Sequence, residues 1–178
     1  MVVGPLVRPA RRLCRRAGGR GVTAPVASAG ILIRRPAAEV FEAFADPVAT
    51  SRFWFTRGSG RLEPGARVRW DWEMYGAGTD VLVKAVEPRR RILIDWDTAG
   101  DPTEVEWRFE ARGEGTFVTV ENRGFEDSPA GVAKALDSNG GFNLVLAAAK
   151  FWLEHGIDPR IIEDVHAAQR RPDWKGRS

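Results

Sequence analysis

The sequence contains few of the residues that disulfides and metal sites require. Its 178 residues include one cysteine, Cys14, and two histidines, His155 and His166. A single cysteine cannot form an intrachain disulfide, and so few thiol and imidazole groups argue against a zinc site. We therefore expect the chain to bind no metal and no cofactor.

Acidic residues are absent from the first part of the chain, where residues 1–35 contain eight arginines and no carboxylate. The remaining residues comprise 19 basic and 24 acidic ones, a formal charge of −5. The pI of about 9.5 therefore arises from the first residues and does not indicate a basic nucleic-acid face on the folded domain. A run of 18 apolar residues, which a membrane-spanning helix needs, is also absent. We expect no nucleic-acid partner and no membrane span.

Residues 1–28 are rich in Arg, Gly, Ala and Pro. This composition predicts a disordered extension, or residues translated from an upstream start codon. An acid-free, Arg-rich segment is also typical of a transit peptide, and an anion-binding arm is a third interpretation. We expect the folded domain at residues 29–157, a helical tail at residues 158–178, and a cytoplasmic protein.

The stretch RVRWDWEMY, residues 67–75, alternates between two kinds of side chain. Val68, Trp70, Trp72 and Met74 fall on one side, and mostly charged residues fall on the other. Strict alternation with aromatic residues predicts a strand that has one buried face. Each Trp side chain buries roughly 150–250 Å², so this face needs a cover such as an amphipathic helix.

Other strands are predicted before and after this stretch. A short apolar run predicts a first strand at residues 29–33, and further strands are predicted at residues 80–86, 91–96, 104–110 and 117–121, of which 91–96 and 104–110 alternate in the same way. Short turns join the successive strands from residue 67 onwards, whereas parallel neighbours would need long crossovers. The sequence therefore predicts an antiparallel meander within a sheet of about six strands.

Two short helices are predicted after the first strand. Apolar residues at helical spacing indicate a helix at residues 37–45. Asp46 followed by Pro47 is typical of an N-cap and a first helical residue, which predicts a second helix that extends to about Arg52.

Helical spacing returns near the end of the domain. We expect a short helix at residues 129–136 and a long one at residues 141–155, whose apolar stripe includes Phe142 and Leu146. Gly156 suits the C′ position of this long helix. The long helix is the expected cover of the Trp70 and Trp72 face, and a weak helix is predicted after it.

A curved sheet and one long helix leave a cleft between them, and small-molecule sites of this kind are mostly apolar. A solid core is the alternative, because protein interiors are close-packed. Buried Trp N–H groups need partners, which a ligand or water would supply, and this favours a cavity. The predicted ligand-binding residues are Trp54 at the rim, with Trp70, Trp72, Met74, Trp107, Phe109, Phe142 and Leu146 inside, and Asn143, beside Asn139, as the polar candidate.

No catalytic residue is predicted. General acid–base catalysis needs a titratable group within reach of the substrate. The carboxylates of the central strands lie on the polar side of the alternation and are expected to point to solvent: Asp71, Glu73, Glu104 and Glu106.

The remaining polar motifs also favour structural roles. His155 is predicted at a helix C-terminus, where its charge suits the helix dipole, and His166 is expected to be exposed. Asp95, Asp97 and Asp101 lack the rest of a calcium-loop pattern, so we expect a solvated turn there.

Taken in order, these motifs resemble the START-like, or SRPBCC, helix-grip superfamily, which includes the birch-pollen allergen. Within it, the chain is most similar to homologues of the activator of heat-shock chaperone ATPase, of the C-terminal domain type. The similar segments are VFEAFADP (40–47), FW (53–54), LEPG (62–65), WDWEMYG (70–76), VEP (86–88), RILIDW (91–96) and GFNLVLAAAKFWLEHGI (141–157).

This resemblance implies an α+β helix-grip fold with a deep hydrophobic cavity, and ligands such as lipids, hormones or polyketides. It implies no shared catalytic set. Three hypotheses follow: a binder of a hydrophobic small molecule, an enzyme of the cyclase or hydrolase kind that acts in the cleft, and a protein that interacts with a chaperone. A homodimer and a chaperone partner both stay open at this point.

Overall fold

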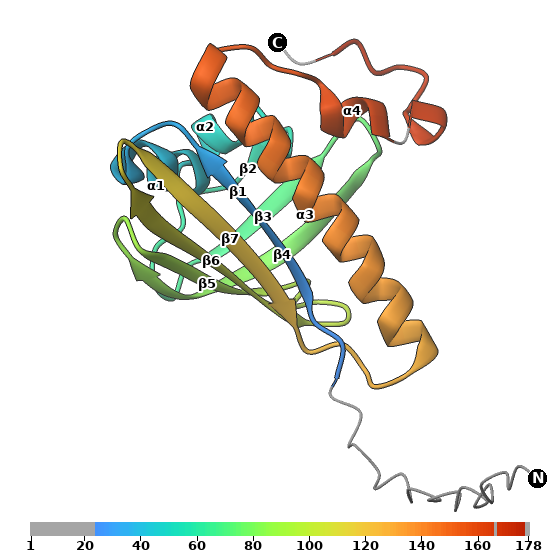
Figure 1. Cartoon of the computed structure of the whole chain (residues 1–178). Coiled ribbons are helices and arrows are strands. Elements are labelled where there is room, and N and C mark those ends of the chain that lie inside the picture. The colour runs from blue at the N-terminus through green and yellow to red at the C-terminus, as the bar shows by residue number, and fades with distance from the viewer. Residues whose placement is uncertain (1–23, 166, 177–178) are drawn as a thin grey trace, which may run out of the picture.

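The computed structural model describes residues 24–165 and 167–176. In this part of the chain, seven antiparallel strands form one curled sheet, and helix α3 runs along it (Figure 1). The strands are β1 (Ala27–Ile33), β2 (Arg57–Gly58), β3 (Arg67–Trp72), β4 (Ala77–Glu87), β5 (Arg91–Trp96), β6 (Thr103–Arg112) and β7 (Gly115–Arg123). The helices are α1 (Ala37–Ala45), α2 (Pro47–Thr50), α3 (Pro129–His155), α4 (Ile161–Val165) and the 3-10 turn η1 (Ala167–Gln169).

The strand order is β1-β7-β6-β5-β4-β3-β2, which confirms the predicted meander. The tightest hairpin joins β6 to β7, where Arg112 faces Gly115 and Gly113 has a φ of 61°. Strand β2 was not predicted, because its two residues are too short to show an alternating pattern. It adds an edge to the predicted sheet by pairing with β3.

Helices α1 and α2 agree with the sequence prediction and cover one end of the sheet. The side chain of Asp46 accepts a hydrogen bond from the Val48 N–H at 2.9 Å, as an N-cap residue does. Helix α2 ends at Thr50, earlier than expected, and a turn leads into the aromatic residues 53–55. These three side chains are buried.

Helix α3 is one continuous helix of 27 residues, so the predicted division into two helices was wrong. Gly140 and Gly141 lie in its middle and each costs about 1 kcal/mol relative to alanine. Packing along the sheet outweighs this cost. Just before the two glycines, the side-chain Nδ2 of Asn139 donates to the Ser28 carbonyl oxygen of β1 at 2.5 Å. The predicted C-terminus is confirmed, since Gly156 has a φ of 68° and its N–H donates to the Trp152 oxygen at 2.7 Å.

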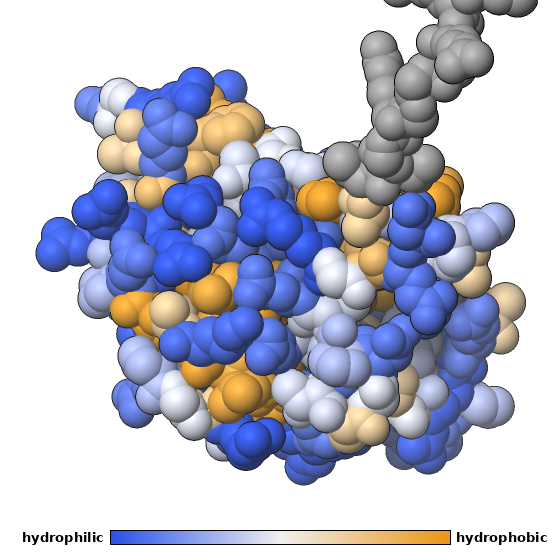
Figure 2. Space-filling model, turned by 90° about the horizontal axis from the view of Figure 1, so that it is seen from below, coloured by the Kyte–Doolittle hydropathy of each residue, from blue (hydrophilic) through white to orange (hydrophobic). Residues whose placement is uncertain are grey.

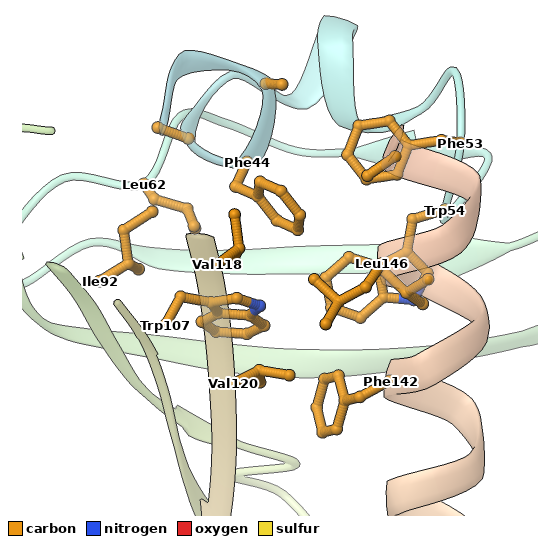
Figure 3. Close-up of a cluster of buried hydrophobic side chains, with 14 of the residues drawn as sticks. Phe44, Phe53, Trp54, Leu62, Ile92, Trp107, Val118, Val120, Phe142 and Leu146 are labelled. Atoms are coloured by element: carbon orange, nitrogen blue, oxygen red, sulfur yellow. The ribbon is translucent and has the colours of Figure 1, made fainter. Parts of the chain in front are cut away.

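The core lies between the curled sheet and helices α1 and α3. Strand β3 buries the predicted side: Val68 and Trp70 are buried, and Trp72 is half-buried. From the opposite side of the core, Phe142 and Leu146 point from α3 toward the sheet and Trp54, and Trp107 points inward from the sheet (Figure 3). The expected contact between the long helix and the tryptophan-bearing layer is therefore present.

On the outer face of the sheet, Glu106 departs from the prediction. Its side chain is 3% exposed instead of pointing to solvent, because arginines from its own strand and the neighbouring strand cover it. Arg91 Nε donates to one carboxylate oxygen at 2.5 Å and Arg108 Nε to the other at 2.7 Å. Desolvation raises the pKa of Glu106, but the hydrogen bond from Arg91 and the charges of both arginines outweigh it and lower the pKa.

The C-terminal segment, residues 158–165 and 167–176, packs against the β3–β4 hairpin (Figure 1). The Tyr75 hydroxyl donates to the Ile162 carbonyl oxygen, and the Arg171 N–H donates to the Met74 oxygen at 2.8 Å. Glu163 is 1% exposed and forms ion pairs with Arg160 and with Arg170. His166 and residues 1–23, with most of the predicted extension, lie outside the described residues.

Hydrophilic residues dominate the face of the molecule that Figure 2 shows from below, and hydrophobic residues gather in a patch among them. Within the described residues, no helix is both long and apolar enough to span a bilayer. Along α3, a few large apolar side chains remain exposed, namely Val132, Leu136 and Phe151.

Candidate functional site

A cavity of about 580 Å³ opens at the end of the sheet that α1 and α2 do not cover. Its walls come from the β3–β4 and β5–β6 turns, the last residues of β7, the N-terminal half of α3, and α4. The lining residues are Trp54, Trp72, Tyr75, Ala77, Trp96, Asp97, Asp101, Thr103, Asn122, Phe125, Lys134, Asp137, Ser138, Gly141, Phe142, Leu144, Val145, Ile162 and Val165.

Four aromatic rings form the inner wall of this cavity. Trp72 stacks on Trp96 with ring centroids 6.1 Å apart, and both side chains are half-buried. Trp54 lies 5.5 Å from Trp96 and 6.2 Å from Phe142. These contacts hold the rings at fixed angles, so the wall presents a rigid aromatic surface to any molecule that enters.

One buried polar group interrupts the apolar wall. Asn122, near the end of β7, is 6% exposed, and its Nδ2 donates to Ser138 Oγ on α3 at 3.0 Å. Its Oδ1 has no hydrogen-bond partner among the described residues. An unsatisfied buried acceptor is unfavourable by about 1–3 kcal/mol, and this one belongs to a residue of the cavity wall although almost none of the oxygen's own surface is exposed.

The mouth of the cavity is acidic. Asp97 and Asp101 come from the β5–β6 loop, and Asp137 comes from α3. Among the described residues, Lys134 is the single lining cation, and its pKa is raised chiefly by its hydrogen bond to Asp101. Three carboxylates against one ammonium group leave the described mouth with a formal charge of −2.

The structure separates the residues predicted to bind a ligand into two sets. Trp54, Trp72 and Phe142 line the cavity. The others do not reach its wall and pack instead in the interior: Trp70, Met74, Trp107, Phe109 and Leu146.

Particular neighbours explain why these interior residues are covered. Phe55 stacks on Trp70 with centroids 5.1 Å apart, and Phe41 from α1 meets Phe109 at 5.4 Å. Met74 is fully buried next to the C-terminal segment, whose Arg171 bonds to its carbonyl oxygen. Segments outside the sheet and α3 thus fill space that the sequence prediction left open.

Asn143 also lies away from the cavity, contrary to the prediction for this polar candidate. It is exposed, and its Nδ2 donates to the Asn139 oxygen one helical turn earlier at 2.9 Å. Asn139 itself bonds to β1. The face of α3 that lines the cavity instead carries Ser138, Gly141 and Val145.

Several lining residues were missed by the sequence prediction although the pattern contained a signal for them. Trp96 follows Ile92 and Ile94 on the inner side of β5, so its alternation placed it in the cavity wall. Asn122 continues the inner side of β7, where a polar residue at an apolar position is conspicuous. The contribution of Ile162 had no such signal, because it depends on how the C-terminal segment folds back.

The described residues offer no arrangement for metal or histidine chemistry at the cavity. Among residues 24–165 and 167–176, no three His, Cys, Asp or Glu side chains come together as metal ligands would. His155 is in the last turn of α3, as predicted, with its ring 4.0 Å from Glu154 and outside the cavity wall. The cavity therefore offers apolar contact and hydrogen bonding.

A curled antiparallel sheet, a long C-terminal helix and a cavity between them define a helix-grip protein of the START-like, or SRPBCC, class. The similarity extends to the sequence, because residues 34–148 match the family described as Activator of Hsp90 ATPase homolog 1-like protein. The chain belongs to this family. A comparison with curated protein sequences gives no match.

Solved structures share the same fold. Protein SSP2350 from Staphylococcus saprophyticus is 29% identical with a TM-score of 0.67, and the match covers 76% of this chain and 96% of that one. DynU16, a protein of the dynemicin biosynthetic locus, is 26% identical with a TM-score of 0.68, covering 75% of this chain and 49% of its own. The Aha1 dimer from Colwellia psychrerythraea has a TM-score of 0.64 at 18% identity, covering 74% and 97%, which shows the fold alone.

Proposed function

We propose that the chain binds an apolar or aromatic small molecule in the cavity between the sheet and α3, without catalysing a reaction on it. The observation that carries this proposal is the aromatic wall around about 580 Å³ of space. Ligand sites typically enclose about 300–1,000 Å³ and are lined mainly by apolar groups with a few polar ones. The cavity meets both conditions.

The aromatic surface of the wall supports the same proposal. Trp72 and Trp96 remain half-buried although they lie in the interior of the fold. Partly exposed indole rings in a concave site gain free energy when a ligand removes them from water, by roughly 25 cal/mol per Å² of apolar surface. A planar hydrophobic molecule would therefore stabilise the protein when it binds.

An enzyme of the cyclase or hydrolase kind is the second candidate, and one observation favours it. The paired Asn122 and Ser138, with carboxylates at the mouth, place polar groups where a substrate would lie. The relative DynU16 comes from a biosynthetic locus. An enzyme would return a ligand of altered mass after incubation, whereas a binder would return it unchanged.

The other partners stay as predictions. Interaction with a chaperone would use the outer surface, and the open cavity gives it no support. The Aha1 dimer is compatible with a homodimer of this chain, which light scattering after size exclusion would test.

Native mass spectrometry of the purified protein tests the proposal, followed by titration of Trp fluorescence with ethylnaphthalene. Gly140 and Gly141 provide a matched pair of variants, since a Cβ at either position meets no atom within 4 Å. Gly141 lines the cavity and Gly140 does not. Gly141→Leu places a side chain at the cavity, so we expect it to weaken both the retention of ligand and the fluorescence change, while Gly140→Leu keeps both.

The two variants share the same change in helix propensity, so their difference reports occupancy of the cavity alone. Equal binding by Gly141→Leu and by the unmodified chain would overturn the proposal. So would the absence of any retained or added ligand in the unmodified chain.

A further inference from the structure

The polar groups of the cavity restrict the ligand beyond its hydrophobic character. We propose that the cavity selects an aromatic ligand that carries a hydrogen-bond donor, an alcohol or an amine, and discriminates against carboxylates. This inference rests on the proposed function, because it concerns the same cavity. Two independent features support it: a buried acceptor at the inner wall, and the charge of the mouth.

The acceptor is Asn122 Oδ1. The side chain is 6% exposed, lines the cavity and has its Nδ2 already engaged by Ser138, so its orientation is fixed from the α3 side. Its oxygen has no partner among the residues that the structure describes. Almost none of this oxygen's surface is exposed, so a ligand O–H or N–H would satisfy it after a small shift of the wall, whereas a purely apolar ligand would leave it unsatisfied.

The charge of the mouth disfavours anionic ligands. Asp97, Asp101 and Asp137 line it, and the Lys134 ammonium group is already bound to Asp101. A ligand carboxylate would meet like charges at close range, and an acceptor-only group cannot bond to Asn122 Oδ1. An ammonium group would meet opposite charge and the faces of indole rings, which attract cations.

Together these features assign a contact to each part of the ligand. The aromatic body lies against Trp72 and Trp96, and the donor group bonds to Asn122. A positive charge near the mouth adds affinity, and a negative charge removes it. Fatty acids and other carboxylates are thus poor ligands, despite the apolar wall.

Isothermal titration with four probes that share a naphthalene body tests this inference: ethylnaphthalene, naphthylethanol, naphthylethylamine and naphthylacetic acid. We expect naphthylethanol and naphthylethylamine to bind about 3–10-fold more tightly than ethylnaphthalene, as for one added hydrogen bond. Naphthylacetic acid should bind more weakly than naphthylethanol. Within the Asn122→Leu variant, the ratio of the affinities for naphthylethanol and ethylnaphthalene should fall to about one. Ser138→Ala, which removes the hydroxyl that holds the Asn122 amide, should reduce this ratio.

The role of the acidic mouth is tested with Asp137→Asn. This substitution should reduce the ratio of the affinities for naphthylethylamine and naphthylacetic acid by about 2–5-fold. Glu114→Gln is the matched control, because Glu114 is exposed in the β6–β7 hairpin at the other end of the sheet and should change nothing. If ethylnaphthalene fails to bind the unmodified chain, the proposed function itself fails. If ethylnaphthalene binds but the four probes bind equally, or the acid binds most tightly, only the selectivity proposed here is overturned.

Discussion

The two ends of the curled sheet carry similar aromatic residues, but one end is closely packed and the other end holds a cavity. At the closed end, α1 and the residues after α2 cover the sheet, and Phe41 and Phe44 pack against Phe109 within 5.8 Å. At the open end, the sheet carries Trp72 and Trp96, yet a cavity of about 580 Å³ lies between them and α3. The number of aromatic rings on the sheet therefore does not decide between a solid core and a cavity.

The segment that faces those rings determines whether the space next to them is filled or left as a cavity. Helix α1 inserts large side chains such as Phe44 at the closed end (Figure 3), and Leu146 from α3 is buried in the same core. At the open end, α3 presents Ser138 and Gly141, which are too small to fill the space. The C-terminal segment covers the opening with Ile162 and does not fill it. Small residues on the helix, beside Phe142 and Val145, thus contribute to the cavity.

The largest predicted effect contrasts a tryptophan from the packed core with one from the cavity wall. Trp107 is 1% exposed, and Trp72 is half-buried. We expect Trp107→Ala to lower the free energy of unfolding by about 3–5 kcal/mol, and Trp72→Ala by about 1–2 kcal/mol, because part of the Trp72 surface is already in contact with solvent. Urea unfolding measures both. Equal losses would show that the two ends are packed alike.

A smaller effect contrasts two buried carboxylates, Glu106 beneath the sheet arginines and Glu163 in the C-terminal segment. In both, desolvation raises the pKa, and hydrogen bonds and charges from arginines outweigh it and lower the pKa. We expect Glu106→Gln to lower global stability by about 1–3 kcal/mol at neutral pH. Glu163→Gln should instead speed amide hydrogen exchange in α4 and leave the sheet protected.

The pH dependence of this effect has a definite sign. A carboxylate whose pKa is lower in the folded state stabilises the fold above its unfolded pKa, about 4.3 for Glu. The stabilisation is lost as the pH falls through the folded-state pKa. The difference in unfolding free energy between the unmodified chain and Glu106→Gln should therefore be largest near neutral pH and shrink below about pH 4. A difference that grows in acid would contradict the ion pairs assigned to Glu106.

The sequence predicted those parts of the fold that depend on local pattern. Helix α1 and the meander follow from the apolar spacing, and Asp46 and Gly156 mark helix ends by their own chemistry. The continuity of α3 through Gly140 and Gly141 was missed, because local propensity opposes it and packing on the sheet overrides it. Strand β2 was also missed, because its two residues form a strand by pairing with β3 and carry no local pattern of their own.

The site was predicted less completely than the fold. Alternation shows that Trp70 faces inward, but it cannot show that Phe55 stacks on it and separates it from the cavity. Burial of Glu106 similarly depends on arginines from two strands, which the register of the sheet brings together. A position in the pattern gives the direction of a side chain, and the neighbours that cover it come from distant parts of the chain.

The open end of the sheet, with Trp72 and Trp96, is the proposed ligand site. The most direct test is a two-dimensional NMR titration with naphthylethanol that follows the indole N–H signals and the backbone amides. We predict that the signals of Trp72, Trp96 and Asn122 shift, while the amides of Ile33 and Ile92 in the core away from the cavity stay unchanged. Shifts confined to the outer face of the sheet, or no shift at any concentration that the probe's solubility allows, would contradict binding in the cavity.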